Sequence, residues 1–402
     1  MKRMLFVDDE PLVLQGLRRM LRSMRNEWKL YFFTRAEEAL KCMDKIHFDI
    51  VVSDIRIPGM GGVRFLNEVR TRYPQTVRII LSGHCDDDAL LQSIGVAHQI
   101  VPKPCDANSL KEILAHTFAL RGLLSNTGLQ KLVSGIDTLP SVPRLYLDIN
   151  DELMSSDPSI QRVADIISTD LGMTAKILQM INSAFFGLRC KVSNIKQAVT
   201  LLGLNTISSF VLTTHFFSMF KGDNLRNFPI DQIRTHSMRT GMFAAAISNA
   251  EGQEANAVDD ARIAGFLHDC GKLLLADKLT KPYIDVFEQS HKDSLPLWQI
   301  EYRQFEASHA EVGAYLLGLW GLSDNIVEAI AFHHRPEDCP HEDFYPITAV
   351  YVANLIEHEI TGPAPEDLTN GVSENYLDML HLENKLPEWR KICYDLDTQK
   401  EV

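Results

Sequence analysis

The chain has 402 residues, of which 45% are hydrophobic and 23% are charged, and its formal net charge is −13. This length predicts two or three domains, and the negative charge argues against nucleic acid as a direct partner, because a phosphate backbone would be repelled. With no apolar run of the roughly 20 residues that span a bilayer and no signal peptide, we expect a cytoplasmic protein without a membrane contact.

Residues 1–125 alternate short apolar runs with amphipathic stretches. The apolar runs predict strands over residues 4–7, 30–33, 50–53, 78–81 and 99–101. Helices are expected between and after them, over residues 11–24, 36–44, 62–72, 86–94 and 106–121. This alternation predicts an α/β fold, a doubly wound parallel sheet of five strands with helices on both faces. In such sheets the functional residues gather at the carboxyl ends of the strands.

Polar residues follow these strands: Asp8 and Asp9 after the first, Asp54 after the third, Ser82 after the fourth and Lys103 after the fifth. Three carboxylates at one edge repel one another unless a hard cation lies between them, and oxygen ligands suit Mg²⁺. A lysine and a hydroxyl supply donors for a phosphoryl group, and a carboxylate can be the nucleophile that accepts it.

This part of the chain resembles the receiver domain of two-component response regulators. The motifs that carry the resemblance are Phe6-Val-Asp-Asp-Glu10, Val51-Val-Ser-Asp-Ile-Arg-Ile-Pro-Gly-Met60, Leu81-Ser-Gly83 and Pro102-Lys-Pro104. One departure is Ile100, which stands where the family usually has an aromatic switch residue.

The resemblance implies that a sensor histidine kinase phosphorylates Asp54, and that Ser82 and Lys103 contact the phosphoryl oxygens. It also implies a Mg²⁺ site formed by Asp8, Asp9, Asp54 and the backbone carbonyl of Arg56. Because receiver domains often dimerise, a homodimer is the default expectation.

In the later part of the chain, strand patterns give way to helical periodicity. We expect a receiver domain over 1–120, a helical linker over 121–128, an all-α domain over 129–360 and a helical extension over 361–402, anchored by Trp389. Such a short linker can transmit a change of orientation. Asp157-Pro158 predicts a helix start with Asp157 as its N-cap.

Residues 126–360 resemble the HDOD domain, an all-helical signalling module related to HD phosphohydrolases. The matching blocks are Leu139-Pro-Ser-Val-Pro143, Ser168-Thr-Asp-Leu-Gly-Met-Thr-Ala-Lys-Ile-Leu178, Ile181-Asn-Ser-Ala-Phe-Phe-Gly187 and Ile195-Lys-Gln-Ala-Val-Thr-Leu-Leu-Gly203.

Histidines recur on four predicted helices of this part. The candidate site comprises His236, His268, Asp269, Lys272, His309, His333, His334 and Asn354. A helical bundle can gather such ligands around one or two metals, which would acidify a water and polarise a phosphodiester while Lys272 holds a phosphate oxygen.

The seven cysteines contain no C-x-x-C pair, which argues against a disulfide framework and a structural zinc site.

Compared with the related HD-GYP phosphodiesterases of cyclic dinucleotides, this site departs at two positions. Gln232 and Asn354 stand where the related enzymes carry carboxylates, and the glycine-rich GYP loop is missing. Asp269 would then be the only acid, which poorly balances a divalent cation. Three alternatives stay open: a histidine cluster without metal, a transition-metal site without turnover, and a working phosphohydrolase.

We therefore expect a response regulator of a two-component phosphorelay that signals through its HDOD domain by binding an unknown downstream protein. The amides at Gln232 and Asn354 argue against an enzyme. The alternative is a metal-dependent phosphodiesterase, acting on a cyclic nucleotide or another phosphoester and controlled by the receiver domain.

Overall fold

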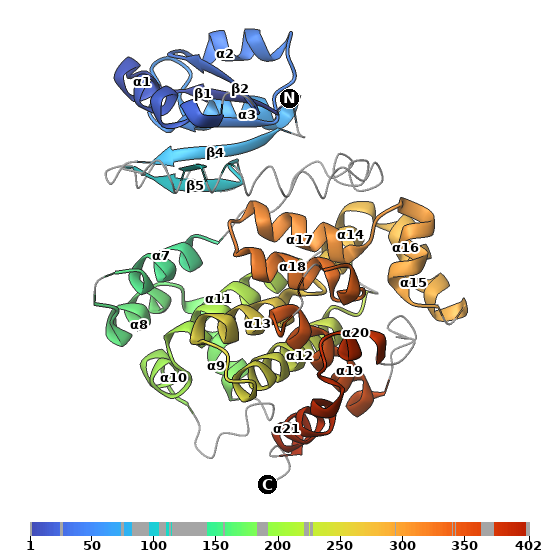
Figure 1. Cartoon of the computed structure of the whole chain (residues 1–402). Helices are drawn as coiled ribbons and strands as arrows, with labels where there is room; N and C mark the ends of the chain where they lie inside the picture. Colours follow the sequence, from blue (N-terminus) through green and yellow to red (C-terminus); the bar gives the residue numbers. More distant parts are fainter. Residues whose placement is uncertain are drawn as a thin grey trace. The chain divides into compact units, whose positions relative to one another are not determined.

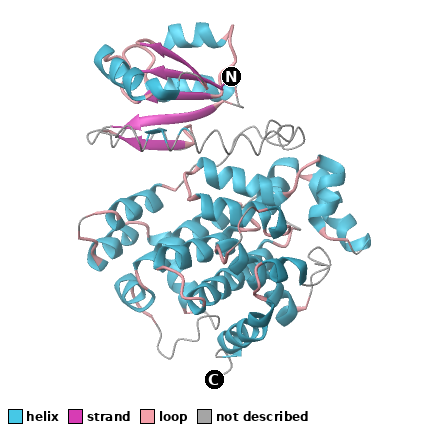
Figure 2. Ribbon diagram, viewed as in Figure 1, coloured by secondary structure: helices cyan, strands magenta, loops and turns pink. Residues whose placement is uncertain are grey.

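In the computed structural model (Figure 1), the chain divides into two compact units. The first comprises residues 1–142 with 315–322 and contains the α/β sheet, and the second comprises residues 143–314 with 323–402 and is helical. The structure describes residues 2–24, 27–73, 76–82, 96–103, 110, 111, 114, 143–155, 157–182, 192–220, 225, 228–293, 295–339, 341, 343–362 and 374–398. Figure 2 shows that strands belong to the first unit and that helices make up the regular structure of the second.

The first unit is built on a parallel sheet with the strand order β2-β1-β3-β4-β5. Its strands are β1 (Lys2–Val7), β2 (Trp28–Phe33), β3 (Ile50–Asp54), β4 (Val77–Ser82) and β5 (Gln99–Pro102). Both alternating sets of side chains in β3 are buried, as expected for a central strand that is covered on both faces. The predicted parallel α/β arrangement is confirmed.

The helices described in this unit are α1 (Pro11–Met20), α2 (Ala36–Met43) and α3 (Gly62–Arg72). The helix predicted over 11–24 ends at Met20, and a 3-10 helix, η1 (Arg22–Met24), follows it. The predicted helix over 86–94 and most of that over 106–121 lie outside the described residues, as does the predicted linker over 121–128.

The strand register aligns the polar residues that follow the strands. Val7 of β1 pairs with Ser53 of β3, so the next residues, Asp8 and Asp54, are neighbours at one edge of the sheet. At the other end of the order, Ser82 of β4 pairs with Pro102 of β5, directly before Lys103. The prediction that these strand ends meet at one edge therefore follows from the pairing.

The second unit is mostly helical, as predicted. Its longer helices are α7 (Arg144–Leu153), α8 (Ile160–Ser168), α9 (Leu171–Ile181), α10 (Ile195–Leu202), α11 (Leu204–Met219), α12 (Ile230–Ala250), α13 (Ala255–Leu267), α14 (Cys270–Leu279), α15 (Lys281–Asp293), α16 (Leu297–Phe305), α17 (His309–Leu319), α18 (Asp324–Phe332) and α19 (Pro346–Thr361). Helices α12, α13, α18 and α19 pack against one another and form its centre.

One helix start differs from its prediction. Helix α8 begins at Ile160, and its N-cap is Ser159, whose hydroxyl accepts a hydrogen bond from the backbone nitrogen of Arg162. Asp157 is not the N-cap, because the backbone nitrogen of Ser159 is bound by Glu152 and the helix starts after that contact. A serine oxygen satisfies the free N–H of the first turn as an aspartate would.

The C-terminal helices α20 (Glu374–Met379) and α21 (Leu386–Thr398) belong to the helical unit. The Trp389 side chain on α21 is fully buried, and its indole nitrogen donates a hydrogen bond to Glu251 over 2.9 Å. Trp389 is thus an anchor, as predicted. Within the described ranges, no single helix is long and apolar enough to cross a membrane; α10 and α11, bent by 119°, meet that criterion only as a pair.

Candidate functional site

The edge of the sheet brings together Asp8, Asp54 and Lys103. Both carboxylates are buried, and the Lys103 ammonium lies between them, 2.8 Å from Oδ2 of Asp8 and in a short ion pair with Oδ1 of Asp54. Burial lowers the pKa of Lys103, but the hydrogen bonds to Asp54 and Asp8 outweigh it, so the pKa is raised above its ordinary value. The lysine is therefore fully charged at neutral pH.

The other predicted residues of this edge are more exposed or are described only by their backbone. Asp9 and the Arg56 side chain are exposed, while the Arg56 backbone nitrogen donates a hydrogen bond to Oδ2 of Asp54 over 2.8 Å. Of Ser82, only the backbone at the end of β4 is described. Three carboxylates and one lysine leave an excess of negative charge on oxygen atoms, so the donor set fits Mg²⁺.

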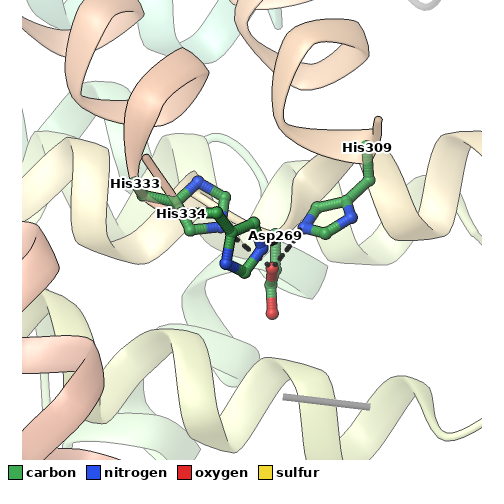
Figure 3. Close-up of side chains that lie close together, drawn as sticks. All are labelled: Asp269, His309, His333 and His334. Atoms are coloured by element: carbon green, nitrogen blue, oxygen red, sulfur yellow. Dashed lines mark hydrogen bonds and ion pairs between the residues drawn. The ribbon is translucent and has the colours of Figure 1, made fainter. Parts of the chain in front are cut away.

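A second cluster in the helical unit is centred on Asp269. His268 ends α13 and Asp269 is the N-cap of α14, so this pair occupies the junction between two helices. His309 begins α17, and His333 with His334 follows α18, so three imidazoles from two helix ends point at the Asp269 carboxylate (Figure 3).

Distances within the cluster are short. Nε2 of His309 lies 3.3 Å and Nε2 of His333 lies 3.8 Å from Oδ1 of Asp269. The Lys272 ammonium, one helical turn along α14, lies 2.9 Å from Oδ2 of Asp269. Nε2 of His334 lies 3.0 Å from Nε2 of His309. The structure therefore brings the predicted residues of α14, α17 and α18 to one carboxylate.

His236 on α12 and His268 reach the same carboxylate from its other side. Nε2 of His236 lies 3.8 Å and Nε2 of His268 lies 3.5 Å from Oδ2 of Asp269. These two Nε2 atoms lie 3.1 Å from each other. The predicted cluster is thus assembled around Asp269 from both sides.

Four of the five histidines are fixed at their outer nitrogen. Nδ1 of His268 contacts the carbonyl of Gly265 and Nδ1 of His333 that of Ile330, over 2.8 and 2.7 Å. The outer nitrogens of His236 and His309 contact carboxylates over 2.6 and 2.7 Å. Because these oxygens only accept hydrogen bonds, each Nδ1 carries a proton, and Nε2 of a neutral ring presents a lone pair inward. Metal-binding histidines are oriented in this way.

Burial keeps most of these rings neutral. It lowers the pKa of His268 to about 4 and lowers those of His333 and His334 well below 6.5. Burial also lowers the pKa of His309, but the charges of Glu301 and Asp269 outweigh it and raise the pKa to about 9. Burial raises the pKa of Asp269, but the neighbouring cations hold it well below its ordinary value.

Comparison with known proteins identifies both parts of the chain. Residues 4–115 match the response regulator receiver domain, and residues 139–336 match the HDOD domain. The chain is a receiver domain joined to an HDOD domain. This is the composition of a two-component response regulator, and both resemblances predicted from the sequence are confirmed.

Curated relatives match parts of the chain. An uncharacterized protein of Treponema pallidum is 27% identical over 57% of this chain and 44% of its own length. The hydrogenase transcriptional regulatory protein HoxA of Cupriavidus necator is 32% identical over 30% of this chain and 24% of its own. The chain thus spans less than half the length of these relatives.

Solved structures resemble the HDOD part. An HDOD domain protein of unknown function from Geobacter sulfurreducens is 25% identical, with a TM-score of 0.54 over 67% of this chain and 97% of that one. A putative phosphohydrolase from Shewanella amazonensis has a TM-score of 0.52 at 19% identity, over 68% and 96% of the two chains. The second likeness concerns the fold alone.

Two acids of the helical unit were missed from the sequence, and the prediction that Asp269 is the only acid of the cluster is wrong. Glu301 on α16 is fully buried. Its Oε2 accepts hydrogen bonds from the backbone nitrogen and from Nδ1 of His309, and its Oε1 accepts one from the Tyr283 hydroxyl. Glu357 on α19 is buried against His236. Neither acid stands at a spacing that the family motif marks, so contacts between helices were needed to find them.

The two amide positions lie on helices that also carry residues of the cluster. Gln232 is exposed on α12, one helical turn before His236. Asn354 is buried on α19 and shares a helix face with Glu357 and His358, three and four residues later. The Asn354 side-chain oxygen has no hydrogen-bond partner among the described residues.

The cluster fits a transition metal. Oδ1 of Asp269 and Nε2 of His333 are buried and lack a hydrogen-bond partner within the described ranges. Asp269, His309, His333 and His334 offer ligand atoms within 4.8 Å of one another, and Asp269 offers the same with His236 and His268. Imidazoles with a carboxylate suit zinc, iron, nickel or manganese.

A cavity of about 610 Å³ opens beside the cluster. Its walls include Gln232, His236, Asp269, Lys272 and Glu357. This volume is in the range of small-molecule sites, and His236, His358, the central carboxylate and the lysine line the cavity.

Two glycines allow the helices to approach this closely. A Cβ atom on Gly271 would lie 1.9 Å from the carbonyl oxygen of His309, so no larger residue lets α14 meet the start of α17. A Cβ atom on Gly265 would lie 2.6 Å from the Cα atom of Gly241, where α13 crosses α12. Both contacts set the helix positions that bring Asp269 to His309 and His268 to His236.

Proposed function

We propose that the protein is a response regulator in which phosphorylation of Asp54 controls the HDOD domain. The observation that carries this proposal is the Lys103 ammonium placed between the buried carboxylates of Asp8 and Asp54. A receiver domain takes its phosphoryl group from a donor such as a histidine kinase, and we propose a sensor histidine kinase here.

Each residue at this edge has a distinct role in the proposal. An Asp54 carboxylate oxygen accepts the phosphoryl group, and Lys103 and Ser82 then contact the phosphoryl oxygens. Asp8, Asp9, Asp54 and the Arg56 carbonyl would hold Mg²⁺, which neutralises charge on the transferred group. The added negative charge competes with Asp8 for Lys103 and biases a two-state equilibrium of the receiver.

The output in this proposal is protein–protein interaction. The receiver (1–120) acts through a helical linker (121–128) on the HDOD domain (129–360) with its extension (361–402), which binds a downstream signalling protein. The negative net charge supports a partner other than nucleic acid. The protein acts in the cytoplasm in this scheme, and a homodimer of receiver domains is compatible with it.

Phosphoryl transfer from labelled acetyl phosphate tests the proposal. Wild-type protein is expected to take up about one label per chain, and Asp54→Asn none. Asp44→Asn, which changes a surface carboxylate of the same domain, is the matched control and is expected to label normally. Labelling of Asp54→Asn to the wild-type stoichiometry would overturn the proposal.

A second candidate function is metal-dependent hydrolysis of a phosphoester, such as a cyclic nucleotide. It is favoured by the inward Nε2 atoms around Asp269 and by the cavity that reaches Lys272. When bound, a transition metal would acidify water and polarise the ester, while Lys272 is placed to hold a phosphate oxygen. Metal binding without turnover is the intermediate possibility.

Metal analysis and an ester assay separate these alternatives. The hydrolase predicts a stoichiometric transition metal and cleavage of bis(p-nitrophenyl) phosphate, both lost in His268→Ala. His215→Ala, which removes a histidine of α11 outside the cluster, is the control. Metal without cleavage supports a binding site without turnover, and a metal-free protein after loading contradicts both.

A further inference from the structure

A second set of metal-ligating side chains lies in the connection that follows the histidine cluster in the sequence. Glu328 is on α18, Cys339 directly follows the 3-10 helix η4 (Pro336–Asp338), and His341 comes two residues later. A carboxylate oxygen, the thiol sulfur and an imidazole nitrogen of these residues lie within 4.8 Å of one another. No residue of this set belongs to the cluster around Asp269.

Glu328 and the cluster residue His333 stand five positions apart on the same helical segment. A rotation of about 100° per residue turns their side chains about 140° away from each other. The two sets therefore use different sides of this segment.

Each of the three side chains is held in place. Nε2 of His341 lies 2.8 Å from Oε2 of Glu328, and the His341 ring stacks on Tyr345 with the centroids 3.8 Å apart. The Cys339 side chain is buried, with 6% of the residue exposed, and its sulfur receives a hydrogen bond from the His341 backbone. The Glu328 and His341 side chains are 36% and 24% exposed, so an ion can enter from solvent.

We propose that Glu328, Cys339 and His341 bind a divalent metal of the zinc class. A thiolate, an imidazole and a carboxylate are the three ligand types that zinc takes in proteins, and a set of three leaves the fourth tetrahedral position to water. Binding displaces the thiol proton of Cys339 to solvent and replaces the hydrogen bond between His341 and Glu328 by two bonds to the ion. Without the ion, burial and the charge of Glu328 keep the thiol protonated.

An ion bound at this site would join two segments of the chain. The connection from residue 333 to residue 346 joins the helix end that carries His333 and His334 to α19, which carries Glu357 and His358. An ion bound to Glu328 at one end and to Cys339 and His341 further along would tie this connection to α18. The spacing is Cys-x-His with a distant glutamate, which a search for C-x-x-C pairs does not detect.

Cobalt substitution of the full chain tests this site without reference to activity. Cobalt bound by a thiolate has a sulfur-to-metal charge-transfer band in the near ultraviolet, and the cluster around Asp269 offers no thiol ligand. Because the cluster around Asp269 can also take up cobalt, the protein is titrated beyond two equivalents. We expect this band to develop in wild-type protein during the titration and zinc to abolish it by displacement. Cys339→Ser is expected to lose the band, and Cys42→Ser, which removes a thiol of α2, to retain it.

Two further variants separate metal binding from folding and from the histidine cluster. Glu328→Gln preserves the shape of a partly exposed residue but removes the anionic ligand, so the band is expected to weaken and zinc affinity to fall. His309→Ala should keep the band while losing metal at the cluster. A wild-type protein without the band, or a band that persists in Cys339→Ser, would show that Glu328 and His341 form an ion pair only.

Discussion

The Nε2 atoms of His236 and His268 lie 3.1 Å apart, although the outer nitrogen of each ring already donates its proton to Glu357 or to the Gly265 carbonyl. Two lone pairs at this distance repel unless one ring is protonated or a cation lies between them. Burial lowers the pKa of His268 to about 4, which makes a proton on that ring unfavourable. Either a proton on His236, which lies against the Glu357 carboxylate, or a cation between the two rings therefore relieves this repulsion.

His309 and His334 repeat this arrangement over 3.0 Å. Here Glu301 raises the pKa of His309, so a proton can take the place of the cation. Glu301 also orients the His309 ring. We predict that Glu301→Gln weakens metal binding at the cluster by about 10- to 100-fold, because the amide no longer fixes and polarises His309. Titration with zinc against a colorimetric chelator measures the change.

Glu359→Gln is the control for this prediction, because it removes a surface carboxylate of α19 that pairs with Arg390. It should bind zinc as the wild type does. Equal zinc affinity in the wild type and in Glu301→Gln would show that Glu301 stabilises the fold only. A fluorescence or circular dichroism melt of each variant confirms that the domain is folded.

The receiver edge could be predicted from sequence and the acids around the histidine cluster could not, for a physical reason. A parallel sheet aligns the ends of its strands, so Asp8, Asp54 and Lys103 were brought together by topology alone. Contacts between helices depend on packing angles that local periodicity does not encode. Glu301 and Glu357 were therefore found only in the folded chain.

The same limit applies to the ends of helices. The 3.6-residue pattern predicted helices over 36–44 and 62–72, and α2 and α3 begin at the predicted residues. At α8, Asp157 and Ser159 are both good N-caps, and the neighbouring Glu152 decided between them. Side-chain competition of this kind is not visible in the sequence.

Because the Lys103 ammonium lies between the Asp8 and Asp54 carboxylates, we predict that its removal lowers the stability of the receiver. Lys103→Met should reduce the receiver's free energy of unfolding by about 1–3 kcal/mol at neutral pH, because two buried carboxylates lose their partner. Mg²⁺ should restore more stability in this variant than in the wild type. Since the pKa of Lys103 is raised, the wild-type contribution is present at neutral pH and is lost only as pH rises through the folded-state pKa.

Urea unfolding with and without Mg²⁺ measures this effect. Lys45→Met, which removes an exposed lysine of the same domain, should change the midpoint little. If both variants respond alike to Mg²⁺, the lysine does not balance the two carboxylates.

His98 predicts an acid sensitivity of the receiver. Burial, and then the charge of Arg78, lower the pKa of His98 well below 6.5, so the folded state stays neutral while the unfolded chain takes up a proton. The neutral His98 ring therefore stabilises the folded state above pH 6.5. As the pH falls from 6.5 to the folded-state pKa, the free energy of unfolding decreases by up to about 1.4 kcal/mol per pH unit. His98→Gln should flatten this slope even though it lowers stability at neutral pH. Denaturation midpoints over a pH series measure it, and parallel slopes would contradict it.

The close approach of α14 to α17 predicts the effect of a single methyl group. Gly271→Ala should cost about 1–3 kcal/mol, because its Cβ would lie 1.9 Å from the His309 carbonyl and one helix must move. Zinc binding at the cluster should weaken in the same variant. Gly16→Ala is the control, since a Cβ there meets nothing within 4 Å on α1, and it should be neutral or stabilising by up to about 1 kcal/mol. Thermal melts and zinc titration compare the two variants.

The amides at Gln232 and Asn354 allow a test by restoring negative charge. Asn354→Asp buries a carboxylate at a side-chain oxygen that has no hydrogen-bond partner within the described residues, so it should destabilise the metal-free domain by about 3 kcal/mol or more. Gln232→Glu adds a second acid at the wall of the cavity. Because carboxylates balance the charge of divalent cations, the double variant should bind more metal per chain, and added zinc or manganese should raise its melting temperature more than that of the wild type. Metal analysis after gel filtration and melts with and without metal measure both effects.

Asn249→Asp, which adds a carboxylate on the exposed side of α12, is the control and should show neither effect. A double variant that binds no more metal than the wild type would mean that Asn354 and Gln232 do not face the metal site.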